Sequence, residues 1–316
     1  MNTLDVSIII VNWNTRDILR DCLRSVYEQT RAISFEVIVV DNASADGSTA
    51  MVGREFPQAI LIENPENRGF AAANNQGMKI ARGRYVLLLN PDTIVLDGAI
   101  EKTMAFADLH PDVGIVGCQV LENETKIQRT CFAFPSLRNL IVQKTGLRRL
   151  FPRSHFFGSA NMGWWDRDTE SDVDVVSGMF MFVKSQAIRQ VGMMDEDYFI
   201  YAEETDWCFR FCKAGWRRVF TPVARIIHRD GGNKSTDPVR LQTYVQFQKS
   251  MLIFYRKHRG LLSWAGAKMI YLVSVLISSI VWNIGRLLNI GKNSQGKARL
   301  CTAALRFYLF GTEPRL

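Results

Sequence analysis

The 316-residue sequence lacks the signatures of several common protein classes. Its six cysteines include no C-x-x-C pair, so they indicate buried reduced thiols rather than a zinc cluster or a disulfide scaffold. No G-x-G-x-x-G follows either early β-branched run, which argues against a dinucleotide cofactor. The first residues carry no basic segment followed by a long apolar core, so we expect no secretory signal and a location in the cytosol or on its membrane face.

Acidic residues are almost absent from the C-terminal part of the chain. Residues 251–316 carry ten basic side chains and one acid, which leaves the first 250 residues at −1 of the total +8. A nearly neutral body argues against a nucleic-acid partner, because nucleic-acid binding needs basic residues across a folded face. A basic, aromatic and aliphatic tail is typical of a segment that binds a lipid surface.

Within this tail, residues 269–285 contain no charged side chain. The stretch is short for a membrane span, which needs about 20 apolar residues, and basic residues flank it on both sides. We therefore expect a helix embedded in one leaflet or packed on the membrane surface, with a second interfacial helix at 296–311. The alternative is a buried core helix of a small helical subdomain.

Short β-branched runs alternate with amphipathic stretches through the first 120 residues. Strands are predicted at 6–12, 35–41, 59–63 and 85–90, and helices at 17–28, 44–56, 74–81 and 99–110. This rhythm indicates an α/β fold with a parallel sheet and crossover helices. Residues 125–172 lack regular periodicity and are expected to form long loops, and a helix at 206–214 and a strand at 224–227 follow.

Polar side chains follow the predicted strands, where ligands of α/β sheets bind. Asp41 can accept hydrogen bonds from a nucleobase or a ribose, or else cap the helix that begins near Ser44. Arg68 can reach a base carbonyl or a phosphate. Asn90 and Asp92 offer the oxygen ligands that suit Mg²⁺ or Mn²⁺ against a diphosphate, and a simple Asn-Pro turn is the alternative.

Taken in order, seven segments resemble family 2 inverting glycosyltransferases of the GT-A fold, and within that family the bacterial rhamnosyltransferase-like branch. They are residues 7–14, 39–44, 67–74, 88–92, 177–178, 195–196 and 201–206. The resemblance covers residues 5–258. It implies a Rossmann-like mixed sheet flanked by helices for a catalytic domain of residues 1–235. The composition of residues 236–316 predicts a helical, membrane-associating extension.

The resemblance also implies roles for individual residues. Asp41 and Arg68 match the positions that hold the nucleobase, and Asp92 matches the metal ligand of the D-x-D motif. His228 matches the histidine that completes the site of a divalent metal, Mg²⁺ or Mn²⁺, although a lone histidine is more often structural. The donor-binding residues implied are Asn12, Asn14, Asp41, Asn67, Arg68, Gly69 and Asn90.

Three acids, Glu203, Glu204 and Asp206, occupy the place of the family's Glu-Asp catalytic motif. The second acid of that motif is the general base, and here it is Glu204, one methylene longer than aspartate, so Glu203 and Asp206 stay open as alternatives. Acids at this position also complement the dipole of the helix that follows. Trp164 and Trp165 can stack on an acceptor sugar or lipid or simply be buried, and Gly178 would let an acceptor approach the backbone.

The sequence thus predicts a metal-dependent inverting glycosyltransferase. We expect it to move a sugar, L-rhamnose from a dTDP donor, onto a lipid-linked saccharide at the cytoplasmic face of the inner membrane, in bacterial polysaccharide or cell-wall synthesis. One alternative is the same fold using a UDP-sugar. The other is a non-catalytic scaffold that binds nucleotide and anionic lipid.

Overall fold

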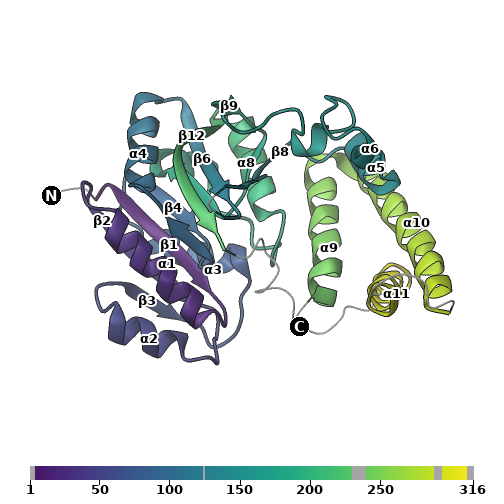
Figure 1. The fold of residues 1–316 in the computed structure, drawn as a ribbon, viewed down its shortest axis with the longest axis horizontal. Coiled ribbons are helices and arrows are strands. Elements are labelled where there is room, and N and C mark those ends of the chain that lie inside the picture. Colours follow the sequence, from purple (N-terminus) through teal and green to yellow (C-terminus); the bar gives the residue numbers. More distant parts are fainter. Residues whose placement is uncertain (1–3, 124, 230–239, 288–293, 312–316) are drawn as a thin grey trace.

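The computed structural model describes residues 4–123, 125–229, 240–287 and 294–311 (Figure 1). One half of its central sheet is parallel, with strands in the order β3-β2-β1-β4. These strands are β1 (Val6–Asn12), β2 (Phe35–Asp41), β3 (Ile60–Glu63) and β4 (Tyr85–Leu89). The crossover helices are α1 (Arg16–Gln29), α2 (Ser48–Glu55) and α3 (Phe70–Ile80). The βαβ rhythm of the sequence is confirmed for this half.

The other half of the sheet is mixed, as the resemblance implied and the rhythm alone did not. It contains β5 (Thr93–Val95), β6 (Val113–Leu121), β11 (Phe180–Lys184) and β12 (Arg217–His228). Strand β11 lies antiparallel between β4 and β6, and β12 pairs parallel with β6 and antiparallel with β5. Helices α4 (Ala99–Leu109), α7 (Ser185–Val191) and α8 (Glu203–Lys213) belong to this half. The mixed sheet that the resemblance implied is therefore confirmed, and the parallel βαβ rhythm of the first 120 residues applies to the other half.

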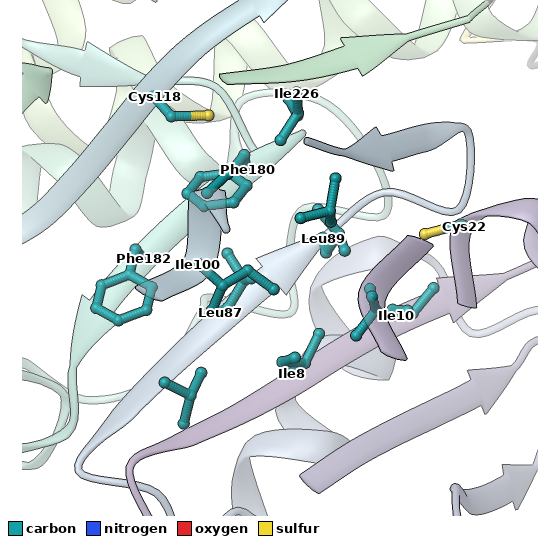
Figure 2. Close-up of a cluster of buried hydrophobic side chains, with 14 of the residues drawn as sticks. Ile8, Ile10, Cys22, Leu87, Leu89, Ile100, Cys118, Phe180, Phe182 and Ile226 are labelled. Carbon is teal, nitrogen blue, oxygen red and sulfur yellow. The ribbon is translucent and has the colours of Figure 1, made fainter. Parts of the chain in front are cut away.

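Alternate residues of the central strands fill two cores on opposite faces of the sheet. Ile8, Leu87 and Phe182 point to one face, where they meet Ile100 of α4 (Figure 2). Ile9, Leu88 and Met181 point to the other face, where α3 and α8 cover them. This follows from the period of two along a strand. All six cysteines are free, and each except Cys212 is buried, as predicted for reduced thiols.

Residues 125–172 are more ordered than their composition predicts. They form β7 (Ile127–Gln128), β8 (Cys131–Phe132), α5 (Leu137–Thr145), α6 (Leu147–Leu150), a 3₁₀ turn (Ser159–Asn161) and β9 (Ser171–Asp172). A further short strand, β10 (Val175–Val176), pairs with β8. The buried guanidinium of Arg167 organises the segment, since it donates to the carbonyls of Trp165 (2.5 Å) and Asn161 (2.6 Å). Arg167, a residue type that usually lies on the surface, is therefore buried and holds this segment together through hydrogen bonds to its backbone.

Three helices follow the sheet: α9 (Arg240–His258), α10 (Gly260–Leu287) and α11 (Ser294–Phe310), which pack on one another at one side of the molecule (Figure 1). Helix α9 also contacts the α/β part of the chain. Its Phe254 packs against Phe209 of α8, and its Ser250 Oγ donates to Ile200 O at 2.8 Å. The domain boundary predicted at residues 235–236 lies outside the described residues.

Helix α10 is longer than the apolar stretch read from the sequence. Its segment Gly260–Gly285 is the one candidate membrane span, by length and composition, among the described residues, and 22% of its most apolar window is buried. Ala267, Tyr271 and Val275 face the neighbouring helices, while Met269 and Ile277 are more than half exposed. A buried core helix, the alternative left open above, does not have this exposure.

Candidate active site

A cavity of about 460 Å³ opens beyond the carboxyl ends of the parallel strands, where the sequence predicted chemistry. It collects residues from nine separate stretches of the chain. The residues singled out from the sequence that line it are Asn67, Gly69, Asn90, Asp92, Gly178, Glu203, Glu204 and His228. Most of the predicted donor, metal and base residues are therefore brought to one place.

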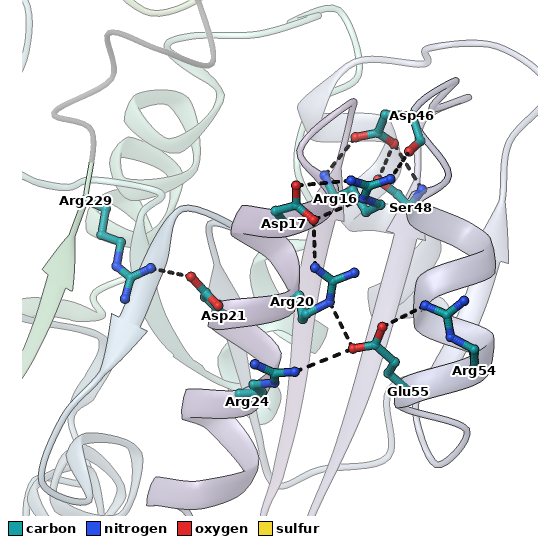
Figure 3. Close-up of polar contacts among 10 residues, drawn as sticks. All are labelled: Arg16, Asp17, Arg20, Asp21, Arg24, Asp46, Ser48, Arg54, Glu55 and Arg229. Atoms are coloured by element: carbon teal, nitrogen blue, oxygen red, sulfur yellow. Dashed lines mark hydrogen bonds and ion pairs between the residues drawn. The ribbon is translucent and has the colours of Figure 1, made fainter.

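Asp92 and His228 meet because β5 and β12 pair with Thr93 opposite His228. Asp92 Oδ2 lies 3.1 Å from His228 Nε2, and the backbone N–H of Arg229 donates to Asp92 O at 3.1 Å. The Arg229 side chain pairs with Asp21 on α1, so the end of β12 is tied to a second element (Figure 3). Two polar side chains distant in sequence are thus held side by side by backbone pairing.

The donor set of this pair suits a divalent metal. Asp92 Oδ1 is buried and has no hydrogen-bond partner among the described residues, so one carboxylate oxygen is left for an added ligand. His228 Nδ1 lies 3.1 Å from Gln128 Oε1, and an N–H donated there leaves the Nε2 lone pair facing Asp92.

Asp92 and His228 supply only two ligands. Within the described part of the chain, no group of three or more His, Cys, Asp or Glu side chains could hold a metal alone. The residues therefore fit a metal whose remaining ligands are diphosphate oxygens and water.

Glu203 and Glu204 also line the cavity, and they begin α8 after a strained turn. Tyr201 and Ala202, neither of them glycine, both have positive φ, 69° and 66°. Such backbone costs about 1–3 kcal/mol per residue and persists where packing enforces it, often at functional sites. Here Ala202 is buried, and Ser250 of α9 binds the carbonyl of Ile200. Packing against α9 therefore aims both glutamates into the cavity.

Burial changes the acidity of both glutamates. It raises the pKa of Glu204 to about 6, and it raises the pKa of Glu203 well above its usual range, with a further contribution from the negative charge of Glu204. Glu203 Oε2 is buried without a partner among the described residues, which also favours its neutral form. Glu204 is half-buried, and it is the acid of the pair that is ionised at neutral pH.

The structure does not bring Asp206 into the cavity. Its carboxylate is fully buried, where Oδ2 binds Arg210 Nε at 2.7 Å and Oδ1 lies 2.5 Å from His258 Nε2. Burial alone would raise the pKa of Asp206, but the hydrogen bond from His258 and the charge of Arg210 outweigh it, and the pKa is lowered. Asp206 therefore joins α8 to the end of α9 and is a positioning residue rather than a base.

Asn12 and Asp41 lie beneath the cavity rather than on its wall. Asn12 Nδ2 donates to Asp41 Oδ2 at 2.7 Å, and the Ser44 backbone N–H donates to Asp41 Oδ1 at 2.8 Å. Asp41 is 2% exposed, and each of its carboxylate oxygens accepts one of these hydrogen bonds from the chain. Asn12 Oδ1 in turn accepts from Thr15, which does line the cavity. These residues hold the loop after β1.

Four more of the predicted residues stay off the cavity wall. Asn14 accepts from the Ala45 backbone, and Arg68 is exposed next to the lining residue Gly69. Trp164 stacks on His155 at 4.3 Å, and Trp165 packs edge-on against Phe220 at 4.8 Å. Both tryptophans thus pack against other aromatic rings of the protein.

Two glycines of the lining differ in what they permit. Gly69 has φ +82°, and a Cβ there would lie 2.3 Å from Phe199 O, so only glycine fits this close approach of two backbones. A Cβ on Gly178 would lie 3.3 Å from the Phe70 ring. The space beside Gly178 is therefore bounded by Phe70.

Several lining residues escaped the sequence reasoning, namely Trp13, Thr15, Asn42, Gln128, Phe199 and Tyr201. Trp13 and Asn42 lie within the segments that resemble family 2, next to the predicted residues Asn12, Asn14 and Asp41. Their position in the sequence was therefore a usable signal. Gln128 and Phe199 come from stretches without periodicity and gave no such signal.

Comparison with known proteins identifies the family. Residues 7–169 match the model of glycosyl transferase family 2, and the chain belongs to this family. It is 27% identical over 236 residues to the N-acetylglucosaminyl-diphospho-decaprenol L-rhamnosyltransferase of Mycobacterium tuberculosis, covering 71% of this chain and 76% of that protein. It is 32% identical over 149 residues to the minor teichoic acid biosynthesis protein GgaB of Bacillus subtilis, covering 44% of this chain and 16% of that protein.

The fold also matches solved glycosyltransferases. A mannosyltransferase of Pyrobaculum calidifontis in complex with GDP-Man and Mn²⁺ superposes with a TM-score of 0.55 at 19% identity, covering 99% of this chain and 89% of that one. The GT-A fold predicted from the sequence is confirmed. The chain is therefore a family 2 glycosyltransferase with relatives in polysaccharide and cell-wall synthesis.

The buried position of Asp206 predicts a stability effect. Asp206→Ala leaves Arg210 and His258 facing a buried gap, and we expect a loss of about 3 kcal/mol in the free energy of unfolding, the low end for a broken buried pair because Arg210 is partly exposed. The matched control Asp197→Ala removes a carboxylate that is 69% exposed and paired with Lys257, and it should cost less than about 1 kcal/mol.

Denaturant unfolding monitored by circular dichroism measures both variants. Because the pKa of Asp206 is lowered by folding, its contribution is present above the unfolded value of 3.8 and is lost as the pH falls through the folded pKa. The gap between the wild type and Asp206→Ala should therefore narrow in acid. Equal stability of the two proteins at neutral pH would contradict the positioning role.

Proposed function

We propose that this glycosyltransferase is metal-dependent and inverting. It transfers L-rhamnose from a dTDP donor to a lipid-linked saccharide in bacterial polysaccharide or cell-wall synthesis. One observation carries the proposal: a single cavity contains the Asp92–His228 pair, with a free carboxylate oxygen, and a glutamate whose pKa suits a base. The Mycobacterium tuberculosis relative is an L-rhamnosyltransferase named for a lipid-linked acceptor, and this supports the choice of sugar and of acceptor class.

The reaction is an in-line displacement at the anomeric carbon. The acceptor hydroxyl gives its proton to the Glu204 carboxylate as its oxygen bonds to the anomeric carbon, and the bond from that carbon to the diphosphate oxygen breaks. The nucleoside diphosphate leaves with the bonding electrons. Asp92 and His228 would hold a Mg²⁺ or Mn²⁺ ion, which neutralises the charge of the diphosphate when bound.

The remaining residues of the cavity bind and orient the donor. Asn42 Nδ2 donates to Gly69 O at 3.1 Å, which joins the loop after β2 to the glycine beneath the cavity. Asn67 Oδ1 accepts from Gly69 N at 3.0 Å. Within this frame Asn67, Gly69 and Asn90 contact the donor, and Arg68 reaches the nucleobase from the rim. Asn12, Asn14 and Asp41 act by holding the loops that carry Trp13 and Thr15.

The chain works at a membrane surface, which we place at the cytoplasmic face of the inner membrane. Helix α10 supports this, because its outward side chains are apolar and exposed. Leu262, Met269, Ile277, Ile280 and Ile284 are each between 50% and 89% exposed. An exposed apolar helix face beside basic residues is typical of a helix that lies in a lipid interface. A lipid-linked acceptor has to be met at such a surface.

The metal pair predicts how nucleotides bind. In calorimetric titrations with dTDP, UDP and GDP, we expect dTDP to bind most tightly and only with Mn²⁺. Asp92→Ala should weaken this binding by about tenfold or more, because it removes a charged ligand. Asp112→Ala, which removes an exposed carboxylate paired with Arg217, is the control and should bind as the wild type does. Preference for UDP would name the UDP-sugar alternative instead, and equal binding with and without metal would contradict the metal site.

The two glutamates make a separate prediction. Glu204→Gln should lower transfer by about 10²- to 10⁴-fold, because the base is lost. Glu203→Gln should keep most activity, because Glu203 is already neutral. Transfer by the wild type should rise with pH through about 6, as Glu204 ionises.

Release of nucleoside diphosphate measures this transfer, with N-acetylglucosamine diphosphate on a short polyprenyl chain as acceptor. Retained dTDP binding shows that each variant is folded. Full activity of Glu204→Gln, with loss in Glu203→Gln, would reverse the assignment. Binding of dTDP by the wild type without any turnover would support the scaffold alternative.

A further inference from the structure

A second cavity, of about 220 Å³, lies between the catalytic body and the C-terminal helices. Its walls come from the segment after β8, from α5, from the start of α8 and from α9 and α10. Glu204 and Tyr201 line this cavity and the donor cavity alike. The carboxylate that takes the proton therefore stands where the two cavities meet.

The lining of the second cavity has the chemistry of a neutral sugar site. Aromatic rings cover much of it, including Phe134, Phe247 and Tyr255, and the amides of Asn139 and Asn161 lie among them. Aromatic faces pack against the C–H face of a pyranose, and amides hydrogen-bond to hydroxyls. Among the described residues that line it, Glu204 alone is charged, so a phosphate group finds no counter-charge inside.

Cations contact the lining from outside. Arg138 lies beside Asn139, with Nη2 3.4 Å from Oδ1, and Lys144 Nζ is 4.8 Å from the ring of Tyr271. Arg259 Nε donates to Pro135 O at 3.2 Å. Each of these three cations thus touches a residue of the cavity wall. Each offers a positive charge to an anionic group joined to a sugar in the cavity, and Lys144 is the one of the three that contacts Tyr271 of α10.

The apolar face of α10 continues this series. Tyr271 lines the cavity from α10, and the exposed side chains of Val273, Leu276 and Ile277 follow on the same helix. The structure thus provides a carboxylate and a sugar-like cavity, with Lys144 against the Tyr271 wall and an apolar face on the helix that carries Tyr271. A polyprenyl-diphosphate-linked saccharide has matching parts: a hydroxyl, a sugar ring, a diphosphate and a prenyl chain.

We infer that the second cavity binds the acceptor sugar of a polyprenyl-diphosphate-linked saccharide, with the diphosphate outside the cavity beside Lys144, which contacts Tyr271 of α10. This inference rests on the proposed function and adds the acceptor site to it. Gln143 lines the cavity from an exposed position on α5. A larger side chain can therefore replace Gln143 without disturbing a hydrophobic core.

The test uses the full-length protein and a fluorescent N-acetylglucosamine diphosphate on a short polyprenyl chain, with binding measured by anisotropy in detergent micelles. Gln143→Trp fills the cavity and should weaken binding by about tenfold or more. Thr145→Trp places the same side chain on the same helix, exposed and off the cavity lining, and should change binding by less than about twofold. Both variants should bind dTDP as the wild type does, which shows that they are folded.

A second probe, the polyprenyl diphosphate without sugar, separates the sugar from the rest of the acceptor. Its binding should not change in Gln143→Trp and should weaken in Lys144→Gln. An equal loss of both probes in Gln143→Trp would mean that the cavity holds the lipid, which overturns the inference. Absence of wild-type binding to the sugar probe while dTDP still binds overturns it as well. Absence of dTDP binding would instead count against the proposed function.

Discussion

The pairing of β12 with β5 is the constraint on which the site depends. It sets His228 opposite Thr93 and so places the imidazole beside Asp92. Asp92 lies in the short turn between β4 and β5, and His228 is the last residue of β12. The pairing of β5 with β12 is what brings these two distant residues together. Backbone ladders are rigid compared with loops, and the Arg229–Asp21 pair stabilises the last residue of the ladder. The backbone ladder therefore sets the geometry of the two side chains that we propose as metal ligands.

The position of Glu203 and Glu204 in the cavity depends on helix–helix packing. Tyr201 and Ala202 adopt left-handed backbone that neither residue favours, and α9 holds them there through Ser250 and Phe254. Asp206 joins the same two helices through His258. The C-terminal helices therefore do two things: α9 shapes the turn before the base, and α10 presents an apolar face to the surroundings. The proposed membrane attachment and the orientation of the proposed base thus depend on helices that pack on one another.

The sequence predicted the features that are local. The strands of the parallel half follow from β-branched runs. Asn67, Asn90 and Asp92, which follow β3 and β4, line the cavity because strand ends share one edge of a sheet. The resemblance to family 2 added His228, which no local pattern distinguishes from a structural histidine.

What the sequence did not reveal depends on contacts between distant segments. The burial of Asp206 requires Arg210 and His258 to meet it from two helices, and the role of Arg167 requires a loop folded around it. Asp41, predicted to hold a nucleobase, also accepts hydrogen bonds from Asn12 and Ser44, which the sequence did not reveal. The left-handed backbone at Tyr201 and Ala202 could not be predicted from residue type, because neither residue is glycine. In each case the residue type was visible but its partner was not.

Pulsed electron paramagnetic resonance of Mn²⁺ bound with dTDP tests the central claim most directly. The account predicts nitrogen modulation from one imidazole in the wild type, and its loss in His228→Gln, while phosphorus coupling from the diphosphate remains. Nitrogen modulation that persists in His228→Gln, or that is missing from the wild type, would show that the pair formed by β5 and β12 is not the metal site.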